Sequence, residues 1–447
     1  MLRSLRGWQR DGDKGRKGCF DQSKQLLNRK EEALRMPDFQ VMAKPHGPIC
    51  NLNCSYCYYL EKQNLYPNQT QWRMSPEVLE SFVRQYIQAQ DGPAVTFVWQ
   101  GGEPTLLGVE FFQKVIALQK RYADGKTVEN AFQTNGILLD DAWCEFLAAH
   151  KFLVGLSIDG PAHLHDAYRL DRGGQPSFDR TMRGLNLLKK HKVEFNTLTV
   201  VNRKNSYFPL DVYRFLKGIG SKYIQFIPVV EMEAEEPNRE GLRLLKPYSS
   251  EPAAISEWSV EAAQYGKFLQ VIFDEWVRKD VGRTFVQIFD VALESWMGLE
   301  QTLCVFNKQC GNAMVLEQNG DLYACDHFVY PENLLGNILD RPLFSMAHSP
   351  GQKRFGQLKS SRLPQYCEQC DVRFACHGEC PKHRFAQTPS GEGGLNYLCA
   401  AYEHFFRHIG PYMKFMAQEL RNDRAPANVM ALARQQDPRG NREAVHS

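Results

Sequence analysis

The sequence lacks three features that would direct it to a membrane, to secretion or to a polyanionic partner. No apolar run approaches the ~18 residues that cross a bilayer, and the N-terminal segment has no continuous apolar stretch of the secretory type. The formal net charge is only +3 over 447 residues, which does not indicate nucleic acid or another strong polyanion as a partner. We therefore predict a cytoplasmic protein that binds neither nucleic acid nor a membrane.

The small positive charge is concentrated at the N-terminus. Residues 1–35 contain ten Lys/Arg and five Asp/Glu, which leaves 44 basic and 46 acidic residues in the rest of the chain. Five acidic residues argue against an organelle-targeting leader, and Met36 directly precedes the first strand-like run. We expect residues 1–36 to be a disordered leader or a segment upstream of the true start.

Cysteine is abundant, with thirteen residues in the chain. In a long chain without a signal peptide, these cysteines predict metal ligands in a reducing compartment rather than disulfides. Cys50, Cys54 and Cys57 have C-x3-C-x2-C spacing, with Tyr56 between the last two. Three thiolates on a short loop can hold an iron–sulfur cluster with one iron open, whereas a zinc site normally uses four protein ligands. The spacing favours a cluster whose open iron binds a substrate or cofactor.

From Phe39 to about Val230, short β-rich runs alternate with helical stretches. Six strands separated by five helices indicate parallel βαβ units, in an open sheet or a partial barrel, with ligands at the carboxyl ends of the strands. The predicted strands are Phe39–Ala43, Ala94–Trp99, Val128–Gln133, Phe152–Ser157, Glu194–Val200 and Tyr223–Pro228. The predicted helices are Pro76–Gln90, Val109–Tyr122, Asp140–His150, Phe178–His191 and Tyr207–Lys217.

Beyond the alternating region, Glu231–Pro252 reads as a linker or a loop over the barrel mouth. Two amphipathic helices are expected to follow, near Val260–Lys279 and Thr284–Leu299. Their aromatic residues are predicted to be core: Tyr265, Phe268, Phe273, Trp276, Phe285 and Phe289.

Short polar motifs follow the predicted strands. Gln100-Gly101-Gly102-Glu103-Pro104 comes after the second strand, and Gln133-Thr134-Asn135-Gly136 ends the third. Both sequences are also compatible with simple turns. The segment Gly155–Pro161 contains Ser157 and is followed by Arg169, whose forked guanidinium suits a carboxylate.

A second cysteine field begins at Cys304. Its eight members are Cys304, Cys310, Cys325, Cys367, Cys370, Cys376, Cys380 and Cys399. Eight thiolates make two complete four-ligand sites, and on spacing alone two zinc ions would also fit. The run from Val315 to Phe328 predicts a hairpin with a turn at Asn319-Gly320. This hairpin presents Cys325 together with Asp326, which could also be only a solvated or capping carboxylate.

These motifs resemble those of the anaerobic sulfatase-maturating enzymes, a family of radical S-adenosylmethionine (SAM) enzymes, over about residues 38–420. The match rests on CNLNCSYCYY, WQGGEPTLLG, FQTNG, FLVGLSIDGP with Arg169, and the Cys325–Asp326 pair. The resemblance implies an α/β fold, a partial (β/α)6 barrel of the radical SAM type followed by a small cysteine-rich SPASM domain. The implied boundaries are 37–232 for the barrel, 233–300 for a linker and helices, 301–405 for the SPASM domain, and 406–447 for a C-terminal helix and polar tail.

The resemblance also implies three [4Fe–4S] clusters and bound SAM. The ligands would be Cys50, Cys54 and Cys57 for the first cluster; Cys304, Cys310, Cys325 and Cys380 for one auxiliary cluster; and Cys367, Cys370, Cys376 and Cys399 for the other. The implied contacts with SAM are Tyr56, Gly102, Ser157, Arg169 and Val230. Tyr59 and Gln100 would seat the substrate peptide.

The implied reaction oxidises a cysteine or serine in a C/S-x-P-x-R type motif of a sulfatase polypeptide to Cα-formylglycine. A radical derived from SAM removes a hydrogen from Cβ, Asp326 takes the thiol or hydroxyl proton, and an auxiliary cluster takes the second electron. We expect a water-poor site to raise the pKa of Asp326; His327 is a weaker rival base. The partners would be the sulfatase and an electron donor such as a flavodoxin or ferredoxin. The alternatives are another SPASM maturase acting on a ribosomal peptide and a non-enzymatic, zinc-binding interaction module.

Overall fold

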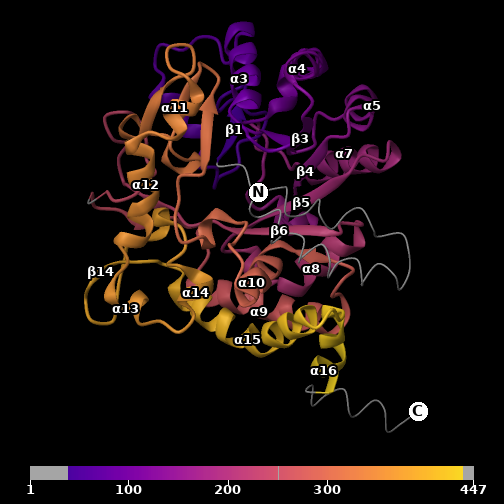
Figure 1. Cartoon of the computed structure of the whole chain (residues 1–447), viewed down its shortest axis with the longest axis vertical. Coiled ribbons are helices and arrows are strands. Elements are labelled where there is room, and N and C mark those ends of the chain that lie inside the picture. Colours follow the sequence, from indigo (N-terminus) through magenta and orange to yellow (C-terminus); the bar gives the residue numbers. More distant parts are fainter. Residues whose placement is uncertain (1–38, 250, 436–447) are drawn as a thin grey trace.

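A ten-stranded sheet forms the centre of the molecule in the computed structural model, which describes residues 39–249 and 251–435 (Figure 1). The predicted leader at residues 1–36 lies outside the described residues. The strand order is β12-β11-β10-β1-β2-β3-β4-β5-β6-β9. The bounds are β1 Gln40–Lys44, β2 Ala94–Trp99, β3 Thr127–Thr134, β4 Leu153–Ser157, β5 Phe195–Val201, β6 Tyr223–Pro228, β9 Phe285–Val286, β10 Ala313–Glu317, β11 Asp321–Tyr323 and β12 Leu334–Asn337.

Neighbouring strands from β1 to β6 pair in parallel, and helices connect them. The connecting helices are α3 Pro76–Gln88, α4 Val109–Tyr122, α5 Asp141–Ala149, α6 Ala162–His165, α7 Phe178–Lys190 and α8 Pro209–Gly218. Their starts follow from local chemistry: the Ser75 side chain accepts from the Val78 amide before α3, and Asp140 accepts from the Trp143 amide before α5. The six predicted strands and five predicted helices are thus confirmed, with differences of one or two residues at their ends.

The predicted helix Thr284–Leu299 is partly wrong. Phe285 and Val286 form β9, which extends the sheet by pairing in parallel with β6, and helix α10 covers only Gln287–Met297. Both strand residues are buried, so their apolar side chains suit either a strand or a helix, and pairing with β6 decides the outcome.

Helices α9 (Ala262–Lys279), α10 and α15 (Cys399–Arg421) pack beside the β6 end of the sheet, as Figure 1 shows. Gly266 allows close contact between α9 and α15, because a Cβ atom there would lie 3.0 Å from the Cα atom of Ala401. The six aromatic residues predicted to be core are all buried. Helix α16 (Val429–Gln435) follows, and no helix in the described ranges is long and apolar enough to cross a membrane.

The hairpin predicted around Asn319-Gly320 is confirmed as β10 and β11, and it belongs to the central sheet. Strand β10 pairs in parallel with β1, with Lys44 opposite Glu317 at their carboxyl ends. Strand β11 then runs back antiparallel to β10, and Asp326, three residues after it, lies 2.8 Å from Lys44 Nζ. The rest of the second cysteine field forms α11 Leu343–Ala347, α12 Pro350–Ser361, α13 Gln365–Glu368, α14 Arg373–Cys376, β13 Ala386–Gln387 and β14 Gly393–Leu395.

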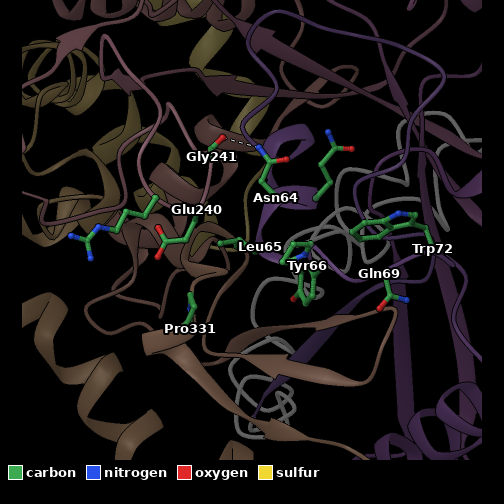
Figure 2. A pocket seen from close by; sticks show the side chains of 11 residues that line it. Asn64, Leu65, Tyr66, Gln69, Trp72, Glu240, Gly241 and Pro331 are labelled. Atoms are coloured by element: carbon green, nitrogen blue, oxygen red, sulfur yellow. Dashed lines mark hydrogen bonds between the residues drawn. The ribbon is translucent and has the colours of Figure 1, made fainter.

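The segment predicted to be a linker or loop, Glu231–Pro252, contains β7 (Met232–Glu233), which pairs in antiparallel with β8 (Ala254–Ile255) just after the segment. Contacts with η1, the short helix after the first cysteine loop (Leu60–Leu65), and with Glu332 hold this segment in place. Figure 2 shows one of these contacts, in which Asn64 Nδ2 donates to the carbonyl oxygen of Gly241 at 2.7 Å. Glu61 accepts from the amides of Arg243 and Leu244, and Lys246 forms an ion pair with Glu332 at 2.8 Å.

Candidate functional site

The first cysteine loop begins after β1 and lies against the segment that follows α6. The amides of Asn53 and Ser55 donate to the carbonyl oxygens of Leu170 and Tyr168, at 2.8 and 3.1 Å. Cys50, Cys54 and Cys57 are half-buried on this loop. Burial raises the pKa of Cys54 to about 12, and Cys57 is close enough to raise it further. The loop therefore presents three neighbouring thiols whose ionisation requires a nearby positive charge, as a bound cluster would supply.

The Gly-Gly-Glu-Pro loop after β2 packs directly on the cysteine loop. The Gly102 amide donates to Gly47 and the Glu103 amide to Ile49, at 2.8 and 2.9 Å. A Cβ atom on Gly102 would lie only 2.0 Å from the carbonyl oxygen of Ile49, so this approach requires glycine. Gln100 is half-buried beside Gly101, and its amide donates to Ala43 at the end of β1.

Glu103 is a buried anchor that the sequence analysis did not single out. Its carboxylate accepts from the Thr105 amide and hydroxyl, the Thr134 hydroxyl and the Asn135 amide, all within 3.0 Å. It thereby joins the Gly-Gly-Glu-Pro loop to the Gln-Thr-Asn-Gly motif after β3. A buried carboxylate this fully hydrogen-bonded holds both loops at a fixed spacing.

Asp159, in the motif after β4, is a second buried anchor for which the sequence predicted no role. It is fully buried and accepts from the Tyr56 hydroxyl at 2.5 Å, from Arg169 Nε at 2.9 Å and from the Val200 amide at 2.9 Å. Two of the predicted SAM contacts, Tyr56 and Arg169, are thus brought together on one carboxylate. The signal that could have identified Asp159 is its place directly after a strand end.

The other predicted SAM contacts lie around the same strand ends. The Ser157 hydroxyl accepts from Gln133 Nε2 at 2.9 Å, which links the ends of β4 and β3. Val230 is almost fully buried two residues after β6. The structure places these side chains at the carboxyl edge of the sheet but adds no observation on which of them contacts a ligand.

Asp326 meets the first cysteine loop through Tyr58. The Tyr58 hydroxyl donates to Asp326 Oδ2 at 2.5 Å, and Lys44 Nζ lies 2.8 Å from Asp326 Oδ1. Lys44 is 1% exposed, at the end of β1. The Tyr59 hydroxyl donates to both carboxylate oxygens of Glu317, and Lys44 Nζ lies 4.2 Å from the centre of the Tyr59 ring. Tyr59 is therefore held in a buried polar cluster around Lys44.

The expectation of a raised pKa at Asp326 is wrong. Burial raises this pKa, but the Lys44 ammonium, His327 and the Tyr58 hydroxyl together lower it below its usual value. The carboxylate is therefore ionised near neutral pH and can accept a proton. Lys44 and Tyr58 were missed because nothing in the sequence indicates that the end of β1 lies opposite β10.

His327, the rival base, faces a different neighbour. Its Nδ1 atom lies 3.5 Å from the sulfur of Cys380, and its ring packs edge-on against Tyr58. Burial, with the nearby Lys382 ammonium, lowers the pKa of His327 to about 3. The neutral imidazole is thus directed at a candidate cluster ligand.

The eight cysteines of the second field form two groups of four that interleave in sequence. Within each group the thiols lie close enough to raise one another's pKa beyond the effect of burial; the first comprises Cys304, Cys310, Cys325 and Cys380, and the second Cys367, Cys370, Cys376 and Cys399. The family resemblance predicts clusters with the same two ligand sets, and this assignment stays a prediction. Within the described part of the chain, no group of three or more His, Cys, Asp or Glu side chains is arranged to hold a single metal ion. Each group nevertheless offers the four thiolates that a [4Fe–4S] cluster requires.

Sequence comparison identifies two regions. Residues 44–215 match the radical SAM superfamily, and residues 304–371 match the SPASM iron–sulfur cluster-binding domain. The chain is 51% identical to the serine-type anaerobic sulfatase-maturating enzyme of Bacteroides thetaiotaomicron over 390 residues, which cover 87% of this chain and 94% of that enzyme. It is 33% identical to the cysteine-type anaerobic sulfatase-maturating enzyme of Clostridium perfringens over 389 residues, 86% of this chain and all of that enzyme.

A comparison with solved structures indicates the same family. Native anSMEcpe with bound AdoMet superposes with a TM-score of 0.74 at 32% identity, over 85% of this chain and 99% of that one. The same values hold for native anSMEcpe with bound AdoMet and the Cp18Cys peptide. The strand-end motifs, the two cysteine fields and these comparisons show that this chain belongs to the anaerobic sulfatase-maturating enzymes of the radical SAM superfamily.

Proposed function

We propose that this chain oxidises a cysteine or serine of a sulfatase polypeptide to Cα-formylglycine, with Asp326 as the general base. The proposal is carried by the hydrogen bond between Tyr58 and Asp326, because it joins the residue after Cys57 to the residue after Cys325. The candidate base therefore lies between the loop that would activate SAM and a ligand of the candidate electron acceptor. A substrate Cβ atom placed there is within reach of both.

Three [4Fe–4S] clusters and SAM complete this assignment. The three thiols of the first loop suit a cluster with an open iron, and the two four-thiol groups suit fully ligated clusters. When bound, these groups supply the electrons and the radical that removes a hydrogen atom from the substrate. Tyr56, Gly102, Ser157, Arg169 and Val230 would position SAM, and Tyr59 and Gln100 would position the peptide.

The chain's own residues account for the proton in this reaction. After one hydrogen atom leaves Cβ, Asp326 accepts the thiol or hydroxyl proton as the double bond to carbon forms; an auxiliary cluster held by the second cysteine field would take up the remaining electron. Serine gives the aldehyde directly, and cysteine gives a thioaldehyde that water hydrolyses with release of hydrogen sulfide. Lys44 and Tyr58 hold the carboxylate in the ionised, oriented form that this step requires.

An electron carrier of the flavodoxin or ferredoxin class would supply and remove electrons. Its proposed approach is supported by a cavity of about 500 Å³ lined by Cys370, Lys308, Arg373 and the exposed ring of Phe374. The lining also contains Glu368 and Asp371, so the exposed apolar ring beside Cys370, and not a net charge, supports this approach. We also infer a cytoplasmic location, where thiols stay reduced, from the cysteine content.

The test is an anaerobic assay of cluster-loaded protein with SAM, a reductant and a sulfatase peptide. Mass spectrometry follows the peptide, and chromatography follows 5′-deoxyadenosine. Asp326→Asn is expected to abolish aldehyde formation while deoxyadenosine still forms, because the base acts after hydrogen removal. The matched variant His327→Gln should retain aldehyde formation. Aldehyde from Asp326→Asn at the wild-type rate would refute the base assignment, and deoxyadenosine without any peptide change in the wild type would refute the substrate.

A further inference from the structure

Two buried cations lie beside the second cysteine field without a carboxylate partner. Lys359 is 0% exposed and Arg384 is 6% exposed. Within the described residues, neither side chain forms an ion pair with an aspartate or a glutamate, and both donate to carbonyl oxygens of the backbone. A buried charge without an opposite charge is costly. These two positions therefore point to an anion that the neighbouring side chains do not supply.

Lys359 faces the loop that carries two of the cysteines. It lies on α12, and its Nζ atom donates to the carbonyl oxygens of Cys304 and Val305, each at 2.8 Å. The same helix approaches Cys310 so closely that a Cβ atom on Gly356 would lie 2.3 Å from the Cys310 carbonyl oxygen. Burial raises the pKa of the Cys304 and Cys310 thiols, and the Lys359 ammonium opposes this rise. The positive charge of Lys359 therefore acts on the first group of four thiols.

Arg384 lies at the segment that joins the two groups of thiols. Its guanidinium donates to the carbonyl oxygens of Gly378 and Glu379, at 2.9 and 3.1 Å, between a cysteine of the second group and a cysteine of the first. Burial raises the pKa of Cys310, in the first group, and of Cys367, in the second, and the Arg384 guanidinium opposes the rise in both. The charge of Arg384 therefore acts on both groups.

A buried carboxylate on the same segment does not neutralise both cations. The Glu379 oxygen Oε2 lies 2.9 Å from His383 Nδ1 and accepts from Asn396 Nδ2 at 2.7 Å. It forms no ion pair with Lys359 or Arg384 in the described part of the chain. Counting this carboxylate against the two cations still leaves one buried positive charge without a counter-charge.

A [4Fe–4S] cluster held by the first group would supply the missing anion. Four thiolates outweigh the positive charge of the iron–sulfur core, and the net negative charge grows by one when the cluster takes up an electron. We propose that Lys359 and Arg384 compensate this negative charge and raise the reduction potential of the auxiliary cluster at the first group. The cluster is then reduced by one electron as the substrate radical is oxidised by one. The proposal rests on the proposed function and adds to it the residues that favour this second electron transfer.

The experiment is an anaerobic redox titration of the full cluster-loaded chain, followed by electron paramagnetic resonance. Added SAM identifies the signal of the cluster on the first cysteine loop, because SAM binds only there. Lys359→Gln removes the charge but keeps N–H donors for the two carbonyl oxygens. The ratio of reduced to oxidised cluster at the first group should fall about tenfold at a fixed solution potential, which is a shift of about 59 mV for one electron. The other auxiliary potential should stay unchanged.

Two further variants separate charge from folding. Lys353→Gln is the matched control, because it removes the same charge from an exposed position on α12 and should leave every potential as in the wild type. Arg384→Gln repeats the test at the second cation and decides the matter if Lys359→Gln loads less iron. Because Arg384 acts on both groups, both auxiliary potentials should fall in this variant. Iron content and circular dichroism establish that each sample is loaded and folded.

The outcomes distinguish this proposal from the proposed function. Unchanged auxiliary potentials in folded, loaded Lys359→Gln and Arg384→Gln would overturn the proposal, and a loss of stability alone would show that the two cations only hold the backbone. If the wild type converts the sulfatase peptide while both variants keep its potentials, the function stands and charge compensation fails. If the potentials fall as expected but the wild type leaves the peptide unchanged, charge compensation stands and the function fails. A wild type without a cluster at the first group would overturn both.

Discussion

Asp159 is the residue whose replacement should most clearly separate cofactor binding from folding. Its carboxylate forms an ion pair with Arg169 at 2.9 Å and accepts hydrogen bonds from the Tyr56 hydroxyl and the Val200 amide. Asp159→Ala leaves the buried Arg169 guanidinium unpaired, and breaking a buried ion pair in this way costs about 3–5 kcal/mol of unfolding free energy. Asp159→Asn also removes the charge that compensates Arg169 but keeps one acceptor oxygen, so it should cost less than Asp159→Ala, about 2–3 kcal/mol.

In Asp159→Asn, the affinity for SAM should fall further than a general loss of folding stability would cause. Arg169 and Tyr56 are fixed by Asp159, so losing one charge-assisted hydrogen bond in Asp159→Asn should raise the Kd for SAM by roughly ten- to a hundredfold. Calorimetric titration of cluster-loaded protein with SAM under anaerobic conditions measures this change. Unfolding followed by circular dichroism measures the stability of the same samples.

Asp140→Asn is the matched control. Asp140 also accepts a backbone amide, that of Trp143, but it begins α5 and has no role in the strand-end cluster. Because asparagine caps a helix as well as aspartate does, this replacement should change the unfolding free energy little and leave SAM affinity unchanged. If Asp159→Asn lowered stability but bound SAM like the wild type, Asp159 would be only a structural residue and the reasoning would be refuted.

Three further variants test the arrangement of the site. Gly102→Ala should prevent the first cysteine loop from closing, so iron content and SAM binding should fall, whereas Gly218→Ala, which meets nothing within 4 Å, should retain both. Burial raises the pKa of Glu317 to about 7, so its protonated form adds stability below pH 4.5 that is lost as the pH rises through 7. Denaturant unfolding of Glu317→Gln should therefore lack a decline of up to roughly 3 kcal/mol between those values; parallel pH curves would contradict this. Tyr58→Phe should lower the rate of aldehyde formation about tenfold with deoxyadenosine and peptide KM unchanged, and an equal loss of both products would argue against its role at Asp326.

The barrel strands could be predicted because their signals are local. Alternating burial in Ala94–Trp99 and the Ser75 cap before α3 are properties of short segments, and each element formed within two residues of its predicted bounds. The helix predicted from Thr284 failed at Phe285 and Val286, because the pairing partner in β6 is far away in the sequence. Sequence periodicity does not report such long-range pairing.

In the candidate site too, residues in local motifs could be predicted, whereas residues brought together by long-range pairing could not. The cysteines and Asp326 stand in motifs that a sequence displays directly, but their partners Lys44, Tyr58 and Asp159 do not. Lys44 is a lone cation after an apolar strand, and its role follows only from the parallel pairing of β1 with β10. The pKa prediction for Asp326 was wrong for this reason. Burial alone would raise the pKa of Asp326, but Lys44, which the sequence does not place beside it, lowers the pKa.

The pairing of β1 with β10 also explains why the two cysteine fields can act on one substrate. The hairpin extends the barrel sheet, and Lys44 and Glu317 lie opposite each other at the ends of β1 and β10. Strand β11 runs back antiparallel to β10, and Asp326, three residues after it, contacts Lys44. Tyr58 from one loop then binds Asp326 from the other. A hydrogen-bonded strand pair holds two loops more firmly than a flexible linker between separate domains. The sheet therefore helps to set the position of the proposed base, Asp326, relative to the first cysteine loop, and substitutions that weaken the β1–β10 pairing should impair catalysis before they unfold the barrel.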